Sequence, residues 1–282
     1  MKLNLPFKAL FVLAVFLRLC GFAYGQSATG INGLYYTGES NGGGLAPAGG
    51  ADGHWSVSYA EVGGTRNTGY EGAGYVVSSP DGGWAANTTN AQWITAPSGP
   101  SLPGNGTSGA NSAAFVYKLA FNITGSGAVG TTVTSKISIT LTIAADDQYS
   151  VYVNPAAGPT VDSTGTISAG GTATSGSRTS AWNNTTALAL QNYSSGGGAN
   201  NAKFVIGTNY LYIVVANTNS QTGNNASSAL NPSGLLVYQV GTAMTINGNP
   251  VVPEVGTWIP VVLALGLFVR RRYVLRHSAQ SA

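Results

Sequence analysis

The residues of this chain that could carry acid–base or metal chemistry are few, and Asp146 and Asp147 are the one pair of adjacent carboxylates. Paired carboxylates can serve a glycosidase, or they can bind calcium through their oxygens. Adjacent residues of a strand point to opposite faces of its sheet, so these two can line one cleft only across a turn. The pair follows an alternating apolar segment, which favours a hairpin turn whose aspartates cap backbone N–H groups. A calcium site at Asp146 and Asp147 is the alternative interpretation.

Hydrolytic catalysis needs a positioned base together with a nucleophile or a metal. Between residues 26 and 249 the chain has one histidine, His54, and no cysteine, so it offers no His/Cys cluster for zinc. A single histidine also leaves little from which to build a catalytic triad. We expect His54 to be a structural or surface residue. The sequence therefore predicts a protein that is not an enzyme and that binds no cofactor.

Carbohydrate binding needs exposed aromatic rings flanked by polar side chains. Trp182 lies in a segment rich in Gly, Ser, Thr and Asn, with Tyr193 nearby in sequence, and these two residues are the candidate glycan contacts. A tryptophan that pins a long loop to the domain is an equally good interpretation of Trp182. Three other tryptophans occupy strand-like segments and are expected in the core: Trp55, Trp84 and Trp93.

The segments that must position these residues are predicted to be strands. Apolar residues occupy every odd position of 137–143 and alternate again in 115–123, so each segment has one buried and one hydrated face. Residues 210–216 are apolar on both sides, which predicts a central strand. The remaining expected strands are 149–153 and 235–240, shorter ones at 34–37, 54–59, 75–78 and 92–95, and weak ones near 161–167 and 187–191.

Turns rich in Gly and Pro separate these segments, and residues 26–249 show no helical period of more than two turns. The pattern predicts an all-β fold with one β-sandwich ectodomain over residues 26–249, closed by the strand at 235–240. The segment 154–202 is expected to be a loop-rich insertion within it.

The N-terminus has the pattern of a signal peptide over residues 1–25. Lys2 and Lys8 precede an apolar run at 10–17, and a small-residue cleavage site lies between Gly25 and Gln26. Cys20 raises the alternative of a lipoprotein, although Leu19 stands where that signal has a small residue. After cleavage no cysteine is left, so the ectodomain has no disulfide.

The C-terminus, residues 250–282, has the pattern of a membrane anchor. The apolar run 255–269 has 15 residues, which is about 22 Å of helix. Apolar neighbours on both sides extend it towards the thickness of a bilayer core. Arg270, Arg271 and Arg272 follow, and such a cluster stays on the cytoplasmic side of a membrane. The pattern predicts one transmembrane helix, with a buried core helix and a charged tail as the alternative.

Charge is concentrated in these two ends. Seven of the twelve lysines and arginines lie in the terminal segments, which leaves five basic residues against eight of the nine acids in the ectodomain. The net charge of the whole chain is +3, and this positive charge comes from its two ends. The middle of the chain has a small negative charge. Nucleic-acid binding, which requires clustered cations against phosphates, is excluded as a partner class.

The C-terminal motif resembles a known sorting signal. Val252, Pro253 and Glu254, then Trp258, a short apolar helix and the arginine cluster are similar to the PEP-CTERM signal of exported proteins in Gram-negative bacteria. That family's usual motif is Pro-Glu-Pro, and Val255 stands at its third position here. The resemblance implies a partner, an exosortase-like membrane protease, and a tail that is removed.

The middle of the chain resembles the jelly-roll, galactose-binding-like ectodomains that occur among PEP-CTERM proteins. The resemblance rests on the order of several blocks: 33–38, 52–57, 84–94, 117–123, 144–154, 207–211 and 234–235. It departs from the family at Asn154, where Pro155 and the long insertion follow.

These patterns together predict a cell-surface or extracellular-matrix protein, secreted or in the outer membrane, whose precursor lies in the inner membrane. The expected role is structural or adhesive within exopolysaccharide. A carbohydrate-binding module that recognises external glycans is the alternative, and a secreted hydrolase is a less favoured one.

Overall fold

The computed structural model describes residues 27–62, 65–77, 83–97, 113–146, 148–155, 157–161, 167–168, 175–178, 183–193, 202–217, 233–239 and 244–251. The chain divides into two compact units, Met1–Val251 and Val252–Ala282, and all of the described residues belong to the first. The predicted signal peptide, with its cleavage site at Gly25 and Gln26, lies outside the described residues. So do the sorting motif from Val252 onward and the predicted helix 255–269. In the ranges given above, no helix is long and apolar enough to span a bilayer.

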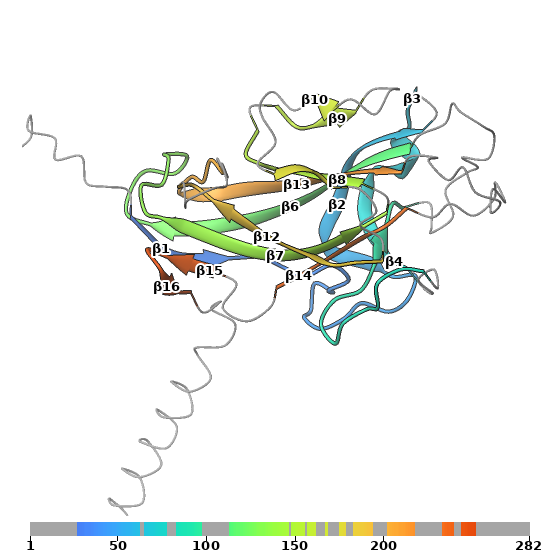
Figure 1. Ribbon diagram of the computed structural model, residues 1–282, viewed down its shortest axis with the longest axis horizontal. Coiled ribbons are helices and arrows are strands. Elements are labelled where there is room, and N and C mark those ends of the chain that lie inside the picture. The colour runs from blue at the N-terminus through green and yellow to red at the C-terminus, as the bar shows by residue number, and fades with distance from the viewer. Residues whose placement is uncertain are drawn as a thin grey trace, which may run out of the picture. The chain divides into compact units, whose positions relative to one another are not determined.

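The described unit is built from strands, as the sequence predicts (Figure 1). Its elements in chain order are β1 Ala28–Asn32, β2 Ala51–Val62, β3 Thr65–Arg66, the 3₁₀ turn η1 Thr68–Tyr70, β4 Gly72–Val76, β5 Ile94–Thr95, β6 Ala113–Gly125, β7 Ile137–Ala145, β8 Gln148–Val153, β9 Thr160–Val161, β10 Ile167–Ser168, β11 Ser175–Arg178, β12 Thr186–Gln191, β13 Gly207–Asn217, β14 Leu235–Tyr238, β15 Met244–Ile246 and β16 Asn249–Pro250.

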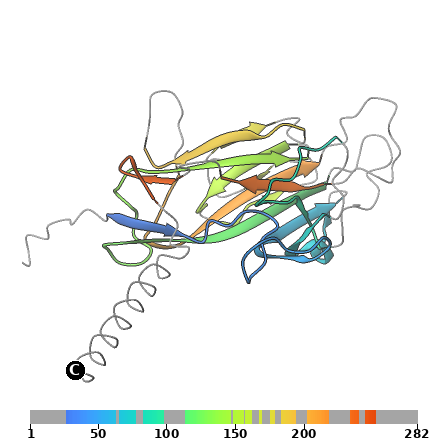
Figure 2. The same ribbon diagram turned by 90° about the horizontal axis from the view of Figure 1, so that it is seen from below.

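Fourteen of these strands form one antiparallel sheet, in the order β11-β8-β13-β6-β2-β4-β5-β14-β7-β15-β16. β1 pairs with β6, β3 with β2 and β12 with β7, while β9 and β10 form a separate pair. The sheet curves back on itself, so that β8, β13, β6 and β2 form one layer and β12, β7 and β14 another. In Figure 2 the gold β12 lies above the orange β13 and the green β6. The architecture is therefore a β-sandwich in which one continuous sheet supplies both layers.

Apolar side chains from the two layers meet in a single core. β6 contributes every second residue from Phe115 to Ile123, and β13 contributes Leu211, Ile213 and Val215. β7 faces them with its odd positions from Ile137 to Ile143. This confirms the period-2 alternation predicted from the sequence, because side chains along a strand point alternately to the two faces of its sheet.

Several predicted strands are confirmed, and two predictions are wrong. Residues 34–37 are not a strand, because Thr37 reaches the sheet from a turn, where its hydroxyl accepts a hydrogen bond from the Val237 amide at 3.0 Å. The Thr37 amide in turn donates to the Val237 carbonyl at 3.0 Å, across 200 residues of chain. The strand in this region is β1, upstream. The segment 235–240 does not close the domain, since β15 follows it and pairs with β7.

The segment 154–202 is less loop-like than predicted at its C-terminal end. β12 within it pairs with β7 over six consecutive residues, from Thr186 opposite Ile143 to Gln191 opposite Ser138. Leu188 and Leu190 enter the core. β12 is thus a regular strand of the second layer.

Removal of a core ring gives a direct test of this packing. Phe115 is fully buried and meets the Tyr70 ring edge-on, with 6.0 Å between ring centres. We expect Phe115→Ala to lower the free energy of unfolding by about 3–5 kcal/mol, because it leaves a cavity between the layers. Val129→Ala, at a residue that is 81% exposed, should change it by less than about 0.5 kcal/mol. Urea denaturation followed by tryptophan fluorescence measures both, and equal midpoints would contradict the assignment of Phe115 to the core.

Candidate functional site

Asp146 lies between two strands that do not pair with each other. β7 ends at Ala145 and pairs with β12, β14 and β15, whereas β8 begins at Gln148 and pairs with β11 and β13. The predicted hairpin turn is therefore wrong, because β7, which Asp146 follows, and β8 belong to different parts of the sheet. Asp146 is buried, and its amide donates to the Gly234 carbonyl at 3.1 Å. Asp147 lies outside the described residues, and the calcium site at Asp146 and Asp147 stays a prediction.

The described part of the chain holds no group of three or more metal-ligating side chains. Two of the expected core tryptophans are confirmed, because Trp55 and Trp93 are buried and their indole N–H groups donate to the carbonyls of Tyr35 and Ala85. Trp84 is half-buried and packs on Trp93, with 4.3 Å between ring centres. The indoles of Trp55 and Trp93 are therefore too buried to offer the free face that sugar binding needs.

Of the two predicted glycan contacts, only Tyr193 is among the described residues, so the structure does not show the two together. Trp182 lies outside the described residues. Tyr193 is half-buried, its hydroxyl accepts a hydrogen bond from Gln191 Nε2 at 3.4 Å, and the Lys136 Nζ lies 5.7 Å from its ring centre. A glycan contact at Trp182 and Tyr193 therefore stays a prediction.

A buried carboxylate fixes the start of β2. Asp52 accepts backbone N–H bonds from Gly38 at 2.6 Å and from His54 and Trp55 at 2.7 Å each. Burial still raises the pKa of this carboxyl above its ordinary value, and the three N–H groups act against that shift. Glu39 is close enough that its pKa is raised as well, by burial first and then by the charge of Asp52.

The loop before β2 contains a Gly-x-Ser-x-Gly pattern over residues 38–42 that the sequence reasoning missed. In hydrolases this pattern sets a nucleophilic serine between a strand and a helix. Here Ser40 lies in a tight turn, where its amide donates to Gly44 O at 2.9 Å and its hydroxyl to Gly43 O at 2.9 Å. An isolated bridge and then β2 follow it in the described chain, so the pattern builds a turn and lacks the geometry of a nucleophile elbow.

Aromatic and cationic side chains gather on the outer face of β6 and β13. Leu119 points into the core, so its neighbours Lys118 and Ala120 point outward. Tyr212 pairs with Lys118, and Tyr210 pairs with Ala120 in the next row. The Lys118 Nζ lies 4.2 Å from the Tyr210 ring centre and 5.8 Å from that of Tyr212, within the range of cation–π attraction.

The same outer face continues on β2. Trp55 pairs with Leu119 and points inward, so His54 points outward, and its ring stacks on Tyr35 with centres 3.4 Å apart and planes 6° apart. We name the set Tyr35, His54, Lys118, Tyr210 and Tyr212 the tyrosine strip. Tyr35 and Tyr210 are 41% and 37% exposed. Because β6 lies between β2 and β13, the His54–Tyr35 stack and Tyr210 are about 10 Å apart.

Two asparagines hold the β13 end of the tyrosine strip in place. Asn154, at φ +44°, accepts a hydrogen bond from the Tyr210 amide at 2.7 Å. Its Nδ2 donates to Asn209 Oδ1 at 2.7 Å and to the Lys203 carbonyl at 2.8 Å. Asn209 is fully buried and donates to the carbonyls of Val205 and Gly207. The backbone beneath Tyr210 is therefore fully hydrogen-bonded and fixed.

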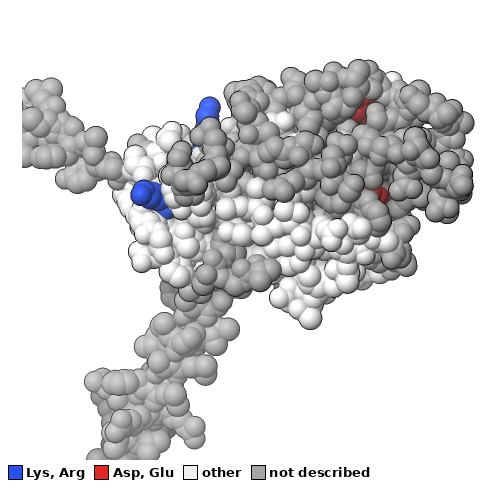
Figure 3. Space-filling view, in the orientation of Figure 1, with Lys and Arg blue, Asp and Glu red and all other residues white. Residues whose placement is uncertain are grey.

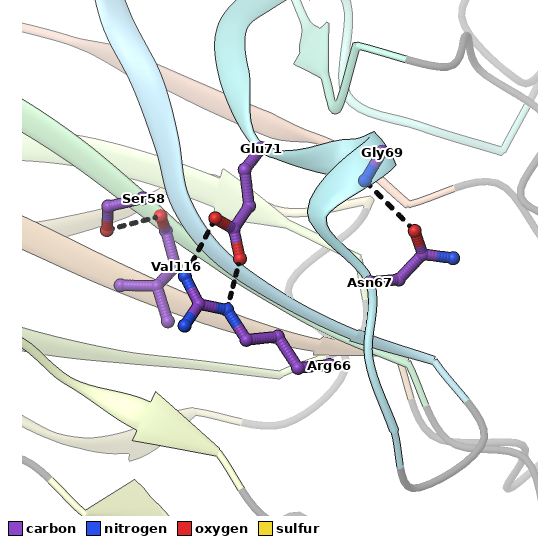
Figure 4. Close-up of polar contacts among 6 residues, drawn as sticks. All are labelled: Ser58, Arg66, Asn67, Gly69, Glu71 and Val116. Atoms are coloured by element: carbon purple, nitrogen blue, oxygen red, sulfur yellow. Dashed lines mark hydrogen bonds and ion pairs between the residues drawn. The ribbon is translucent and has the colours of Figure 1, made fainter.

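The opposite end of β2 carries a surface ion pair (Figure 4). Arg66 donates from Nε and Nη2 to the two carboxylate oxygens of Glu71, at 2.7 and 2.9 Å, and its guanidinium lies 5.1 Å from the Tyr59 ring centre. The pair lowers the pKa of Glu71, with Arg66 as the main cause. Asn67 caps the adjacent η1 turn by accepting the Gly69 amide at 3.0 Å. These contacts shape the turn and leave no charged group free.

On the face that Figure 3 shows, few of the described side chains are blue or red. Comparison with known proteins found no matching family model, no matching curated protein and no matching solved structure.

The tyrosine strip is the feature of the described residues that offers exposed aromatic rings beside a cation. It was missed from the sequence because residues 210–216 look apolar on both sides; the signal was the pair Tyr210 and Tyr212 at alternate positions.

The pKa shifts at the two ends of β2 predict opposite dependences on pH. The raised pKa of Glu39 means that its contribution to stability is complete at acidic pH and is lost as the pH rises through that raised value. We expect Glu39→Gln to flatten the fall in unfolding free energy between about pH 4 and pH 7. Glu71→Gln is the matched control, because the lowered pKa of Glu71 stabilises the fold above its ordinary value and is lost towards acid. Denaturation curves should show a change of slope above the ordinary glutamate pKa for Glu39→Gln and a change of opposite sign below it for Glu71→Gln, and changes of the same sign would contradict the assignment.

Close packing of the 38–44 loop on β2 gives a second test. A Cβ at Gly53 would overlap the backbone nitrogen of Asn41, whereas a Cβ at Gly42 in the same loop would meet nothing within 4 Å. We expect Gly53→Ala to lower the unfolding free energy by about 1–3 kcal/mol. Gly42→Ala should change it by less than about 0.5 kcal/mol. Thermal melts of the two variants, measured side by side, check this, and equal melting temperatures would show that the loop does not rest on β2.

Proposed function

We propose that this chain is an exported protein that acts outside the cytoplasm as a structural or adhesive component of an exopolysaccharide-rich surface. The observation that carries the proposal is the partition of the chain. Seven of twelve basic residues lie in two apolar-rich ends, and the cysteine-free middle is an all-β sandwich of very low charge. Such a surface has no strong electrostatic preference for nucleic acid or for anionic membranes.

The proposed sorting route follows from the C-terminal motif. Val252, Pro253, Glu254 and Trp258, with the arginine cluster at 270–272, would be recognised by an exosortase-like membrane protease. The apolar run 255–269 would hold the precursor in the inner membrane until it is processed. The N-terminal signal peptide would be cleaved between Gly25 and Gln26. The mature protein would then reach the outer membrane, the cell surface or the matrix.

The finer architecture that we propose is the jelly-roll, galactose-binding-like sandwich. The order of sequence blocks from 33–38 to 234–235 supports it. The sheet order supports it as well, since β2 and β6 are neighbours although three strands and the η1 turn separate them in the chain. β5 and β14, which are far apart in the chain, are also neighbours. Greek-key and jelly-roll sandwiches are built from such long connections between antiparallel neighbours.

A carbohydrate-binding module is the second candidate, and the tyrosine strip favours it. Half-exposed rings on a rigid sheet face offer the flat apolar surfaces on which sugar rings stack. The hydrolase alternative gains nothing from the described residues, because the His54 ring stacks on Tyr35 and Ser40 lies in a turn. Structural and glycan-binding roles are compatible in one matrix protein.

The sorting proposal is tested on the native protein in a cell that carries an exosortase and exports polysaccharide. Fractionation followed by intact-mass analysis should find a surface or extracellular form that begins at Gln26 and ends near Pro253. Glu254→Ala should leave the precursor in the inner membrane with its tail intact, whereas Ser278→Ala, beyond the arginine cluster, should be processed normally. A full-length, unprocessed chain in the soluble cell interior would overturn the proposal.

A further inference from the structure

We propose that the tyrosine strip binds acidic polysaccharide, with Lys118 pairing with a carboxylate of the glycan and Tyr210 stacking on an adjacent sugar ring. The inference rests on the proposed function and adds to it a site and a ligand class. The site is distinct from the pair Trp182 and Tyr193 that the sequence suggested, because it lies on the first layer of the sandwich and is formed by β2, β6 and β13.

The first step is the distribution of charge. Residues 26–249 contain only five basic residues, and one of them, Lys118, has its ammonium group over the Tyr210 ring. Lys118 lies over its ring, and the backbone carbonyl of Lys203 accepts from Asn154, which in turn binds the Tyr210 amide. Lys203 itself is exposed. A cation held over an exposed ring, in a domain with a small negative charge, points to an anionic ligand at this ring.

The second step is that no carboxylate of the described residues forms an ion pair with Lys118. Of the carboxylates in the described residues, Asp52, Glu61 and Asp146 are buried, and Glu39 and Glu71 are half-buried. Asp52, which lies nearest to the strip, accepts three backbone N–H groups beneath His54. The ion pair in this part of the structure is that of Arg66 and Glu71, at the far end of β2. The Lys118 ammonium thus meets ring faces, with no carboxylate beside it among these residues.

The third step is that the platform is rigid before any ligand arrives. The Tyr35 ring is stacked on His54, and the carbonyl of Tyr35 accepts from the buried indole of Trp55. At the other end Asn154 and Asn209 fix the backbone of Tyr210. Little side-chain freedom is lost when a ligand stacks on rings that are already held in place, which favours binding of a weakly interacting polymer.

The fourth step is the match between this surface and a charged sugar chain. A sugar ring has an apolar face that packs on tyrosine and an edge of hydroxyls that needs polar partners. A uronic acid or other carboxylated sugar adds an anion, for which the Lys118 ammonium offers up to three donors. The two exposed rings, about 10 Å apart on either side of β6, allow contacts with more than one sugar of the same chain.

The test uses the full-length chain in detergent and two cellulose derivatives with the same backbone, carboxymethyl cellulose with carboxylates and hydroxyethyl cellulose without them. Affinity electrophoresis should show retardation by carboxymethyl cellulose that weakens as salt is added, and weaker retardation by hydroxyethyl cellulose. Lys118→Met, which removes the charge and keeps the apolar stem, should raise the dissociation constant for carboxymethyl cellulose about tenfold. Tyr210→Ser should weaken binding to both polymers.

Lys136→Met is the matched control, because Lys136 also lies over a tyrosine ring, that of Tyr193, in the other layer. It should leave the dissociation constant within about twofold of wild type, since one net charge alone has a small effect at moderate salt. Circular dichroism and melting temperature establish that each variant is folded. Equal binding of Lys118→Met and wild type, or an equal loss in Lys136→Met, would overturn the assignment of the tyrosine strip.

The remaining outcomes separate this inference from the proposed function. Retardation by both polymers that is unchanged in Lys118→Met and Tyr210→Ser would overturn the strip and leave glycan binding elsewhere on the chain. An absence of retardation by either polymer would overturn both the strip and the carbohydrate-binding candidate. The exported, structural role would then be decided by the processing of the C-terminus alone.

Discussion

The apolar contact between the two layers is the interaction on which the rest of the structure depends. Residues 26–249 have no cysteine and few charges, so neither disulfides nor ion pairs can stabilise this domain appreciably. What remains is burial: alternate residues of β6 and β13 face the odd positions of β7 in one continuous core. Each strand gives one face to this core, and the other face of β6 and β13 carries a second buried cluster, which includes Val116 and Val214, beside more exposed side chains. The tyrosine strip occupies such a face.

The sequence was sufficient to predict the strands that obey a strict alternation. Residues 115–123 and 137–143 were placed correctly because their apolar period matches the pleat, whatever their partners are. The partners were not predictable in this way. The residues around Asp146 do not distinguish a hairpin from a connection between layers, because the difference is that β8 pairs with β13 and not with β7. Residues 34–37 failed for the same reason, as Thr37 makes its sheet-like bonds only with Val237.

The candidate site shows a related limit. Tryptophans attract attention in a sequence, yet Trp55 and Trp93 are buried beneath the sheet. The exposed rings are tyrosines whose neighbours look equally apolar, and register alone decides that Tyr210 faces outward beside Lys118. His54 was expected to be a structural or surface residue, and its stacking on Tyr35 could not be predicted, because the two residues lie on different segments of chain.

The bonds between Thr37 and Val237 also bear on when this domain can fold. They join positions near its two ends. The pairing of β1 with β6 and that of β7 with β15 also join segments that are far apart in the chain. Pairings so distant along the chain form slowly, because a long loop must close before any contact rewards it. A polypeptide emerging from the ribosome can therefore complete its sheet only once nearly all of it has been made. Such a delay keeps the chain unfolded for longer, and an unfolded chain is what a secretory channel accepts.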